Sequence, residues 1–195
     1  MTENNERKLV RMTKCMKLLF GILLMACTTH VLAQAGSVAE TAAHTSFAQV
    51  VALDECDPAT FNAALGADFC KNVTLGAFTT LADLFSEAAS GHPDPKWDFE
   101  PDVVHLNQGG VVRVVDQGGE PHTFTEVAHF GGGFITDLNG GEQTVPECSG
   151  GFANLAVART RILQGSDSQI ANLSKGKHLF QCCIHPWMRV EVDVK

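Results

Sequence analysis

The chain has 195 residues and a hydrophobic content of 45%, enough for one domain with a real core. Its formal net charge of −8 argues against nucleic-acid binding, because proteins that bind nucleic acids carry basic surfaces.

The first 33 residues have the layout of a secretory signal peptide. Basic residues precede Leu18–Cys27, an apolar run of ten that is shorter than the roughly 20 residues needed to cross a bilayer. The segment ends on small residues at Ala33. We therefore predict cleavage after Ala33, a periplasmic or secreted protein, and no membrane span.

A possible lipoprotein signal overlaps this secretory signal peptide. Leu24–Cys27 resembles a lipobox, which would make Cys27 a lipid anchor. Cleavage after Ala33 is favoured because the stretch before it is polar. Without residues 1–33 the chain keeps 9 basic and 20 acidic residues, a formal charge of −11. That charge would steer a basic redox partner, or it simply keeps an exported protein soluble.

Residues 34–95 have the pattern of a helical N-terminal extension. Asp57-Pro58 can open a helix, with Asp57 as the cap and the proline in the first turn. A second amphipathic stretch runs from Thr80 to Ala89. The prolines and glycine of residues 91–95 then mark a boundary.

Residues 96–195 favour a β-domain. Two β-branched runs, Val103–Leu106 and Val111–Val115, flank a hairpin-like connection at residues 107–110. Further strands are expected at His122–Val127, Ala156–Leu163, Gln169–Leu173, His178–Cys182 and Val190–Val194. About seven short strands in this length predict a mainly β, antiparallel sandwich. Phe130–Gly151 is expected to be a long glycine-rich loop beside the functional site.

The cysteines suggest a metal-binding thiolate. Five cysteines remain after the signal, and an odd number in an oxidising compartment leaves one over. The simplest pairing is Cys56–Cys70 and Cys148–Cys183, which leaves Cys182 free. Neighbours on an extended segment point to opposite faces, so Cys182 and Cys183 can have different roles. A Cys182–Cys183 or Cys148–Cys182 bridge remains open.

The C-terminal run contains a soft set of metal donors. Cys182, His185 and Met188 are spaced at offsets of three residues on a tight loop between two strands. Two imidazoles and one thiolate with a weak thioether describe a blue-copper site. The second imidazole is expected from His122, which follows Pro121 at the start of a strand.

These motifs resemble the cupredoxins, particularly plastocyanin and amicyanin. The resemblance covers residues 97–195 and rests on the Pro-His pair and the terminal Cys-x-x-His-Pro-x-Met. It implies a Greek-key β-sandwich that binds one type 1 copper through His122, Cys182, His185 and Met188. Thr123 stands where better-known members have Asn, so its hydroxyl must replace the amide's bonding to the Cys loop. Cys183 stands where Ser or Thr is usual, and the loop at residues 130–151 is longer than in small members.

Three other functions use the same residues. Cys182, Cys183, His185 and His122 could be drawn as a structural zinc site, but adjacent cysteines rarely reach one ion. A copper carrier or storage protein is a further alternative. A multicopper enzyme is disfavoured, because Gln181 and Cys183 flank the cysteine where such enzymes carry histidines. We expect no enzymatic activity, and we interpret His44, His92, His105, His129 and His178 as structural or surface residues.

The expected function is outer-sphere electron transfer. The resemblance implies that the far edge of His185 opens to solvent, with Pro186 and Trp187 as an apolar docking collar for redox partner proteins. We expect a monomer.

Overall fold

The computed structural model describes residues 44–72 and 78–195, which belong to one compact unit. The predicted signal segment, its cleavage after Ala33 and the alternative anchor at Cys27 lie outside these residues. Within the described part of the chain, no helix has the length and apolar character needed to cross a membrane.

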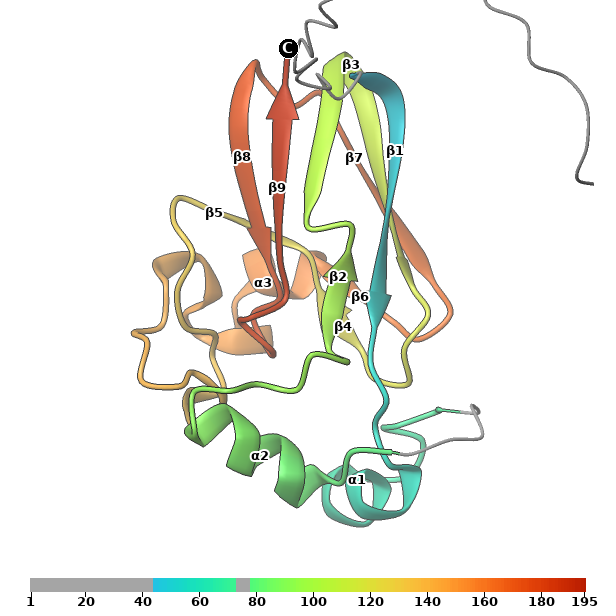
Figure 1. Cartoon of the computed structure of the whole chain (residues 1–195), viewed down its shortest axis with the longest axis vertical. Coiled ribbons are helices and arrows are strands. Elements are labelled where there is room, and N and C mark those ends of the chain that lie inside the picture. Colours follow the sequence, from blue (N-terminus) through green and yellow to red (C-terminus); the bar gives the residue numbers. More distant parts are fainter. Residues whose placement is uncertain (1–43, 73–77) are drawn as a thin grey trace, which may run out of the picture. The chain divides into compact units, whose positions relative to one another are not determined.

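Strands dominate the described structure (Figure 1). They are β1 (Thr45–Leu53), β2 (Asp98–Glu100), β3 (Val103–Asp116), β4 (His122–Thr123), β5 (Thr125–Val127), β6 (Arg161–Ile162), β7 (Asp167–Ala171), β8 (Gly176–Gln181) and β9 (Arg189–Val194). The α-helices are α1 (Pro58–Leu65), α2 (Leu81–Ala89) and α3 (Leu155–Arg159). Three short 3-10 turns, η1 (Thr136–Leu138), η2 (Pro146–Cys148) and η3 (Gly151–Ala153), complete the described elements.

The strands form two facing layers connected by the long strand β3. One layer contains β5, β8, β9 and the first part of β3; the other contains β2, β1, β7 and the second part of β3. A separate two-stranded ladder joins β4 to β6. The mainly β sandwich predicted from the sequence is confirmed, although it is mixed rather than wholly antiparallel: β1 and β9 both run parallel to β3.

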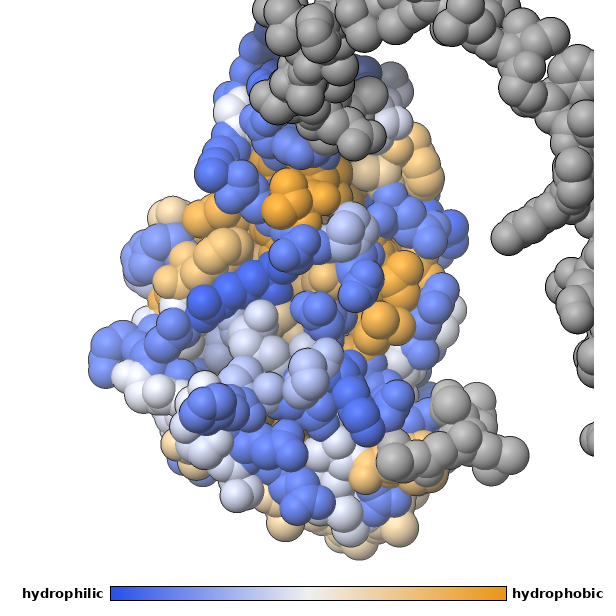
Figure 2. Space-filling view, in the orientation of Figure 1, coloured by the Kyte–Doolittle hydropathy of each residue, from blue (hydrophilic) through white to orange (hydrophobic). Residues whose placement is uncertain are grey.

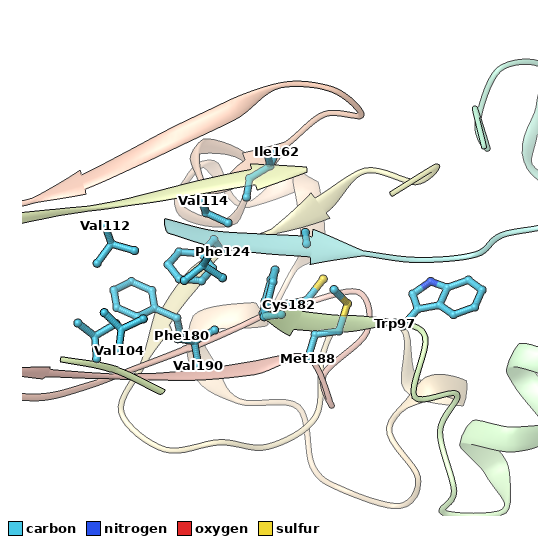
Figure 3. Packing of buried hydrophobic residues seen from close by; sticks show 14 of the residues in the cluster. Trp97, Val104, Val112, Val114, Phe124, Ile162, Phe180, Cys182, Met188 and Val190 are labelled. Carbon is cyan, nitrogen blue, oxygen red and sulfur yellow. The ribbon is translucent and has the colours of Figure 1, made fainter. Parts of the chain in front are cut away.

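Alternating side chains of the two layers fill the core. Figure 3 shows Val112 and Val114 on one side and Val104, Phe180 and Val190 on the other. All of these side chains are at most 4% exposed. Removing such side chains from water is the main favourable contribution to folding. Cys182 and Met188 lie at one end of this cluster, toward Trp97 (Figure 3).

The predicted hairpin at residues 107–110 is wrong. Val103–Asp116 is one continuous strand whose first part pairs with β9 and whose second part pairs with β1 and β7. The two β-branched runs therefore have different partners instead of each other. The positive φ of Gly109, 80°, falls where the strand passes between these partners.

The helical prediction for the segment before Trp97 is only partly correct. The two expected helices are present, capped by the side chains of Asp57 and Thr80. Thr45–Leu53, however, is the strand β1, hydrogen-bonded between β2 and β3. Its Val50 and Ala52 are fully buried with period two, so pairing to β3 overrides the helical propensity of its alanines.

One prediction near residue 155 also needs correction. Residues 156–163, expected to be a strand, begin with helix α3 and end with the short strand β6. The side chain of Asn154 caps the helix by accepting a hydrogen bond from the Ala156 amide. The expected long loop at residues 130–151 is confirmed and contains η1, η2 and the start of η3.

The face drawn in Figure 2 is mostly hydrophilic, with separate apolar patches. Large hydrophobic side chains that are exposed in the described regions come from separate segments: Phe47, Leu65, Val103, Phe152, Leu155 and Leu163. Leu65 and Leu163 lie together in one surface pocket, and single exposed apolar side chains are normal for a protein surface.

Candidate metal centre

Three of the predicted ligands meet at one end of the sandwich. The donor atoms of His122, Cys182 and His185 all lie within 4.8 Å of one another, and the three side chains are buried. His122 begins β4, while Cys182 and His185 lie in the connection between β8 and β9. Two backbone hydrogen bonds tighten this connection, from the Cys182 amide to the Met188 carbonyl (3.1 Å) and from the Met188 amide to the His185 carbonyl (3.0 Å).

The ring of His122 is oriented by a buried carboxylate. Its Nε2 donates to Oδ2 of Asp54 at 2.9 Å, and its Nδ1 lies 3.8 Å from the Cys182 sulfur. A carboxylate on the far nitrogen of a metal-binding histidine fixes the tautomer and the ring plane. His122 therefore presents Nδ1 to the centre.

Asp54 is in turn held by a tight turn before β4. Its carboxylate accepts hydrogen bonds from the amides of Gly119 (2.8 Å) and Glu120 (3.0 Å). A Cβ on Gly118 would meet Asp54 Oδ2 at 1.9 Å, so the turn approaches closely only with glycine there. Burial acts to raise the pKa of Asp54, but the bond and charge of His122 and the two amides outweigh it and lower that pKa.

His185 has one nitrogen engaged and one that faces the centre. Its Nε2 lies 3.4 Å from Oε2 of Glu120, which also accepts a 2.9 Å hydrogen bond from Trp97 Nε1. Its Nδ1 is buried and has no hydrogen-bond partner in the described structure. A buried polar atom left in this way needs an explanation, and a bound metal ion supplies one.

Cys182 is poised as a thiolate. Burial acts to raise its pKa, but the neighbouring imidazoles of His122 and His185 outweigh that effect and hold the pKa well below its usual value. The amides of Thr123 and His185 also lie at 3.5 Å from the sulfur. A deprotonated sulfur is the form that binds metals.

The cysteine pairing matches the simplest scheme. Disulfides join Cys56 to Cys70 and Cys148 to Cys183, and Cys182 is free. Cys183 thus turns away from the centre and ties the Cys182 loop to the 130–151 loop. A Cβ on Gly133 would meet the Cys183 carbonyl at 2.1 Å, so these two loops pack with direct backbone contact.

Thr123 supports the Cys182 loop as its position predicts. Its hydroxyl oxygen accepts a 2.7 Å hydrogen bond from the Cys183 amide. The hydroxyl thereby makes the hydrogen bond to the cysteine loop that was expected from it in place of an asparagine amide.

Met188 is fully buried and packs in the same core cluster as Cys182. Figure 3 shows both sulfur-containing side chains at the Trp97 end of the cluster. The structure therefore places the fourth predicted ligand in the same region.

The expected solvent-exposed edge of His185 is not observed. His185 is only 2% exposed, Pro186 is buried, and Trp187 is partly buried with its Nε1 donating to the Trp97 carbonyl. The ring of Phe61 in α1 stacks on Trp97 with 6.2 Å between ring centres, and the tilted rings of Trp97 and His185 have centres 6.1 Å apart. In Figure 1, α1 and α2 lie at this end of the sandwich. The segment before β2 therefore covers the surface that was predicted to be a docking collar.

Sequence reasoning missed the two carboxylates. Glu120 lies two residues before His122, within the motif that identified the histidine, but its spacing alone does not reveal a partner for His185. Asp54 is 68 residues from His122 in sequence, and only the placement of β1 beside β3 brings it to the site. No local sequence signal would have found it.

The fold can also be compared with known proteins. No family model and no curated protein sequence match the chain. Among solved structures it is similar to a reduced amicyanin variant (18% identity, 50% of this chain, 73% of that chain, TM-score 0.33). It is also similar to a second reduced amicyanin variant (19% identity, 52% of this chain, 77% of that chain, TM-score 0.34). A third similar structure is a purple cupredoxin from Nitrosopumilus maritimus (13% identity, 76% of this chain, 99% of that chain, TM-score 0.38). The β-sandwich of this chain is defined by the strand pairing described above.

Proposed function

We propose that the chain is an exported type 1 copper protein that carries single electrons, with one copper held by His122, Cys182, His185 and, axially, Met188. The observation that carries this proposal is the buried convergence of the Cys182 sulfur with ring nitrogens of His122 and His185, all within 4.8 Å of one another. Two imidazoles and one thiolate, with a thioether nearby, are the donor set of blue-copper sites.

The residues around the centre suit electron transfer. Bound copper would supply a one-electron couple at this site. Asp54 and Glu120 fix the two imidazole rings, and the Cys148–Cys183 disulfide ties down the thiolate loop. Because the donors are already held in a buried, water-excluding site, little rearrangement accompanies a change of charge.

The same features disfavour the alternatives from the sequence. Cys183 is in a disulfide, so it is removed from the donor set of a structural zinc site. A copper carrier or store must exchange its metal, whereas His122, Cys182 and His185 are at most 2% exposed. The disulfide thus disfavours structural zinc, and the burial favours a retained metal over a delivered one.

The route to a redox partner differs from the one the resemblance implies. Trp187 lies 5.5 Å from His185, ring centre to ring centre, and lines a surface pocket together with Pro93 and Arg189. We infer that electrons reach a partner protein past this partly buried indole instead of through an exposed His185 edge.

The test is the visible absorption and EPR spectrum of the mature chain, defined as residues 34–195, after addition of Cu(II). An intense visible band with narrow copper hyperfine splitting is expected, because both signatures arise from a copper–thiolate bond. Cys182→Ala should abolish the band.

The matched control is the double variant Cys148→Ala/Cys183→Ala. It removes the adjacent cysteine and its disulfide but keeps the proposed ligand, so the band should remain. Persistence of the band in Cys182→Ala, or a colourless wild type that binds zinc instead, would refute the proposal.

A further inference from the structure

A second group of metal-binding side chains lies at the opposite end of the sandwich. It consists of His44, just before β1, His105 of β3 and Asp193 of β9, whose donor atoms all lie within 4.8 Å of one another. In Figure 1 the start of β1 and the end of β9 lie together, away from the β8–β9 connection. Asp193 is five residues from Met188, and five residues of extended strand span about 16 Å. This second group is therefore well separated from the proposed copper ligands.

Strand pairing brings these three residues together. His105 and Asp193 are direct neighbours across the parallel β3–β9 ladder. Their flanking residues Leu106 and Val192 are buried, so His105 and Asp193 share the face that points away from the core. His44 is held beside them because Asn107 Nδ2 donates to its backbone carbonyl at 3.3 Å.

The three side chains face one another at ion-pair distances. Oδ2 of Asp193 lies 3.4 Å from His44 Nε2 and 3.6 Å from His105 Nδ1. Both nitrogens are buried and have no hydrogen-bond partner in the described residues. Two buried imidazole nitrogens therefore converge on one carboxylate oxygen at ion-pair distance, which is an arrangement that a shared metal ion would satisfy.

The two nitrogen–oxygen separations can be compared with the ligand spacing of common coordination geometries. In a tetrahedral zinc site with bonds of about 2.0–2.1 Å, neighbouring ligand atoms lie about 3.3–3.4 Å apart. In a square-planar or octahedral site with similar bonds the separation is about 2.9 Å. The observed 3.4 and 3.6 Å fit the tetrahedral case.

We propose that His44, His105 and Asp193 form a second metal site that binds Zn²⁺, with water as the fourth ligand. Asp193 is 26% exposed and His105 is 33% exposed, which leaves room for that water. The Lys195 ammonium, 3.4 Å from the same Asp193 oxygen and well exposed, moves aside when the ion binds. The ion fastens the beginning of β1 to β3 and β9, independently of the copper centre.

The experiment is equilibrium dialysis of the mature chain against Zn²⁺ in a Cys182→Ala background, which removes the thiolate of the first centre. About one zinc per chain is expected. Adding His44→Ala or His105→Ala should weaken zinc binding by more than about 100-fold, because each removes a direct ligand. Replacing zinc with Co²⁺ should give the strong visible bands of tetrahedral cobalt.

His178→Ala is the matched control. His178 is another partly buried histidine beside a carboxylate, with Nδ1 2.6 Å from Glu126, but without a second histidine at that pair. It should leave zinc binding unchanged. Zinc should also raise the Tm of the background protein but not of its His105→Ala derivative.

Equal zinc affinity in the His44, His105 and His178 variants would overturn the proposal, as would the absence of bound zinc in the background protein. The copper band of the single variant His105→Ala should equal that of the wild type. This measurement separates a failure of the zinc site from a failure of the proposed copper function.

Discussion

At the scale of single residues, two carboxylates that are not predicted ligands orient the two predicted ligand histidines. Asp54 and Glu120 each contact the nitrogen that faces away from Cys182. Both are buried, and burying a charge is costly unless it is paired. Their cost is offset by the imidazoles, the indole of Trp97 and the amides of the Gly118–Glu120 turn, which together make one connected network.

Met188→Leu should keep the copper site and raise its reduction potential. Leucine is close to methionine in volume, so this fully buried substitution should cost less than about 1.5 kcal/mol of stability. Loss of a weak donor to Cu(II) favours Cu(I), which raises the potential. Protein-film voltammetry measures the shift. A lower potential, or an unchanged one, would contradict an axial role for Met188.

Asp116→Asn should make the metal-free protein more stable at high pH. Burial is the main reason that the pKa of Asp116 rises to about 7, with the positive charge of His122 opposing it. The carboxyl of the unfolded chain has a pKa of about 3.9. Between these values the folded state binds more protons, so stability falls as pH rises. Asparagine cannot ionise and keeps the acceptor for the Gly118 amide.

The measurement is urea unfolding of the wild type and of Asp116→Asn at pH 5 and pH 8. The stability advantage of the variant should widen by about 2–3 kcal/mol over this range. Asp167→Asn is the control, because this exposed carboxylate beside Arg113 has a lowered pKa and is ionised at both pH values. An advantage that stays constant between pH 5 and pH 8 would show that Asp116 does not titrate as described.

The sequence suggests a ligand set because three of the proposed ligands are neighbours in one short loop. Cys182, His185 and Met188 need only a tight connection between two strands to converge, and local spacing contains that information. His122 is remote, but the Pro-His pair at a strand start marks it. The carboxylate of Asp54 is invisible to such reasoning, since its role depends on β1 pairing with β3.

At the scale of elements, the misread segments share one physical cause. Val103–Leu106 and Val111–Val115 each look like half of a hairpin, yet they are one strand with different partners in two layers. Thr45–Leu53 has helical composition, yet it is buried in period two beside that strand. Local propensity is weak against long-range pairing. The capped helices α1 and α2 were predictable because their caps are local.

The Cys148–Cys183 disulfide should stabilise the protein more than the Cys56–Cys70 disulfide. The sequence separations are 35 and 14 residues. Loop-closure entropy then gives about 4 kcal/mol for the longer loop and about 3 kcal/mol for the shorter one. Denaturant unfolding of the two double Cys→Ala variants measures the difference. If removing Cys56–Cys70 costs clearly more, contacts that its loop makes in the folded state outweigh chain entropy.

At the scale of the whole molecule, the segment before Trp97 belongs to the sandwich and to the metal centre alike. It supplies β1 to the sheet, Phe61 to the aromatic stack over His185, and Asp54 to His122. A boundary at residue 95, drawn from the prolines and glycine of residues 91–95, separates parts that pack together. The covered His185 follows from the same arrangement.

A chain limited to residues 96–195 should therefore fail to fold. Without β1, one edge of β3 loses its longest ladder, and the core loses Val50 and Ala52, both fully buried. Burial of each valine-sized side chain contributes about 1.5–3 kcal/mol, and domains are stable by only about 5–15 kcal/mol. Near-UV circular dichroism and the cooperativity of urea unfolding measure the outcome, with the mature chain as control. A cooperative transition and a copper–thiolate band in the 96–195 fragment would show that the C-terminal part is a domain of its own, as the sequence pattern first indicated.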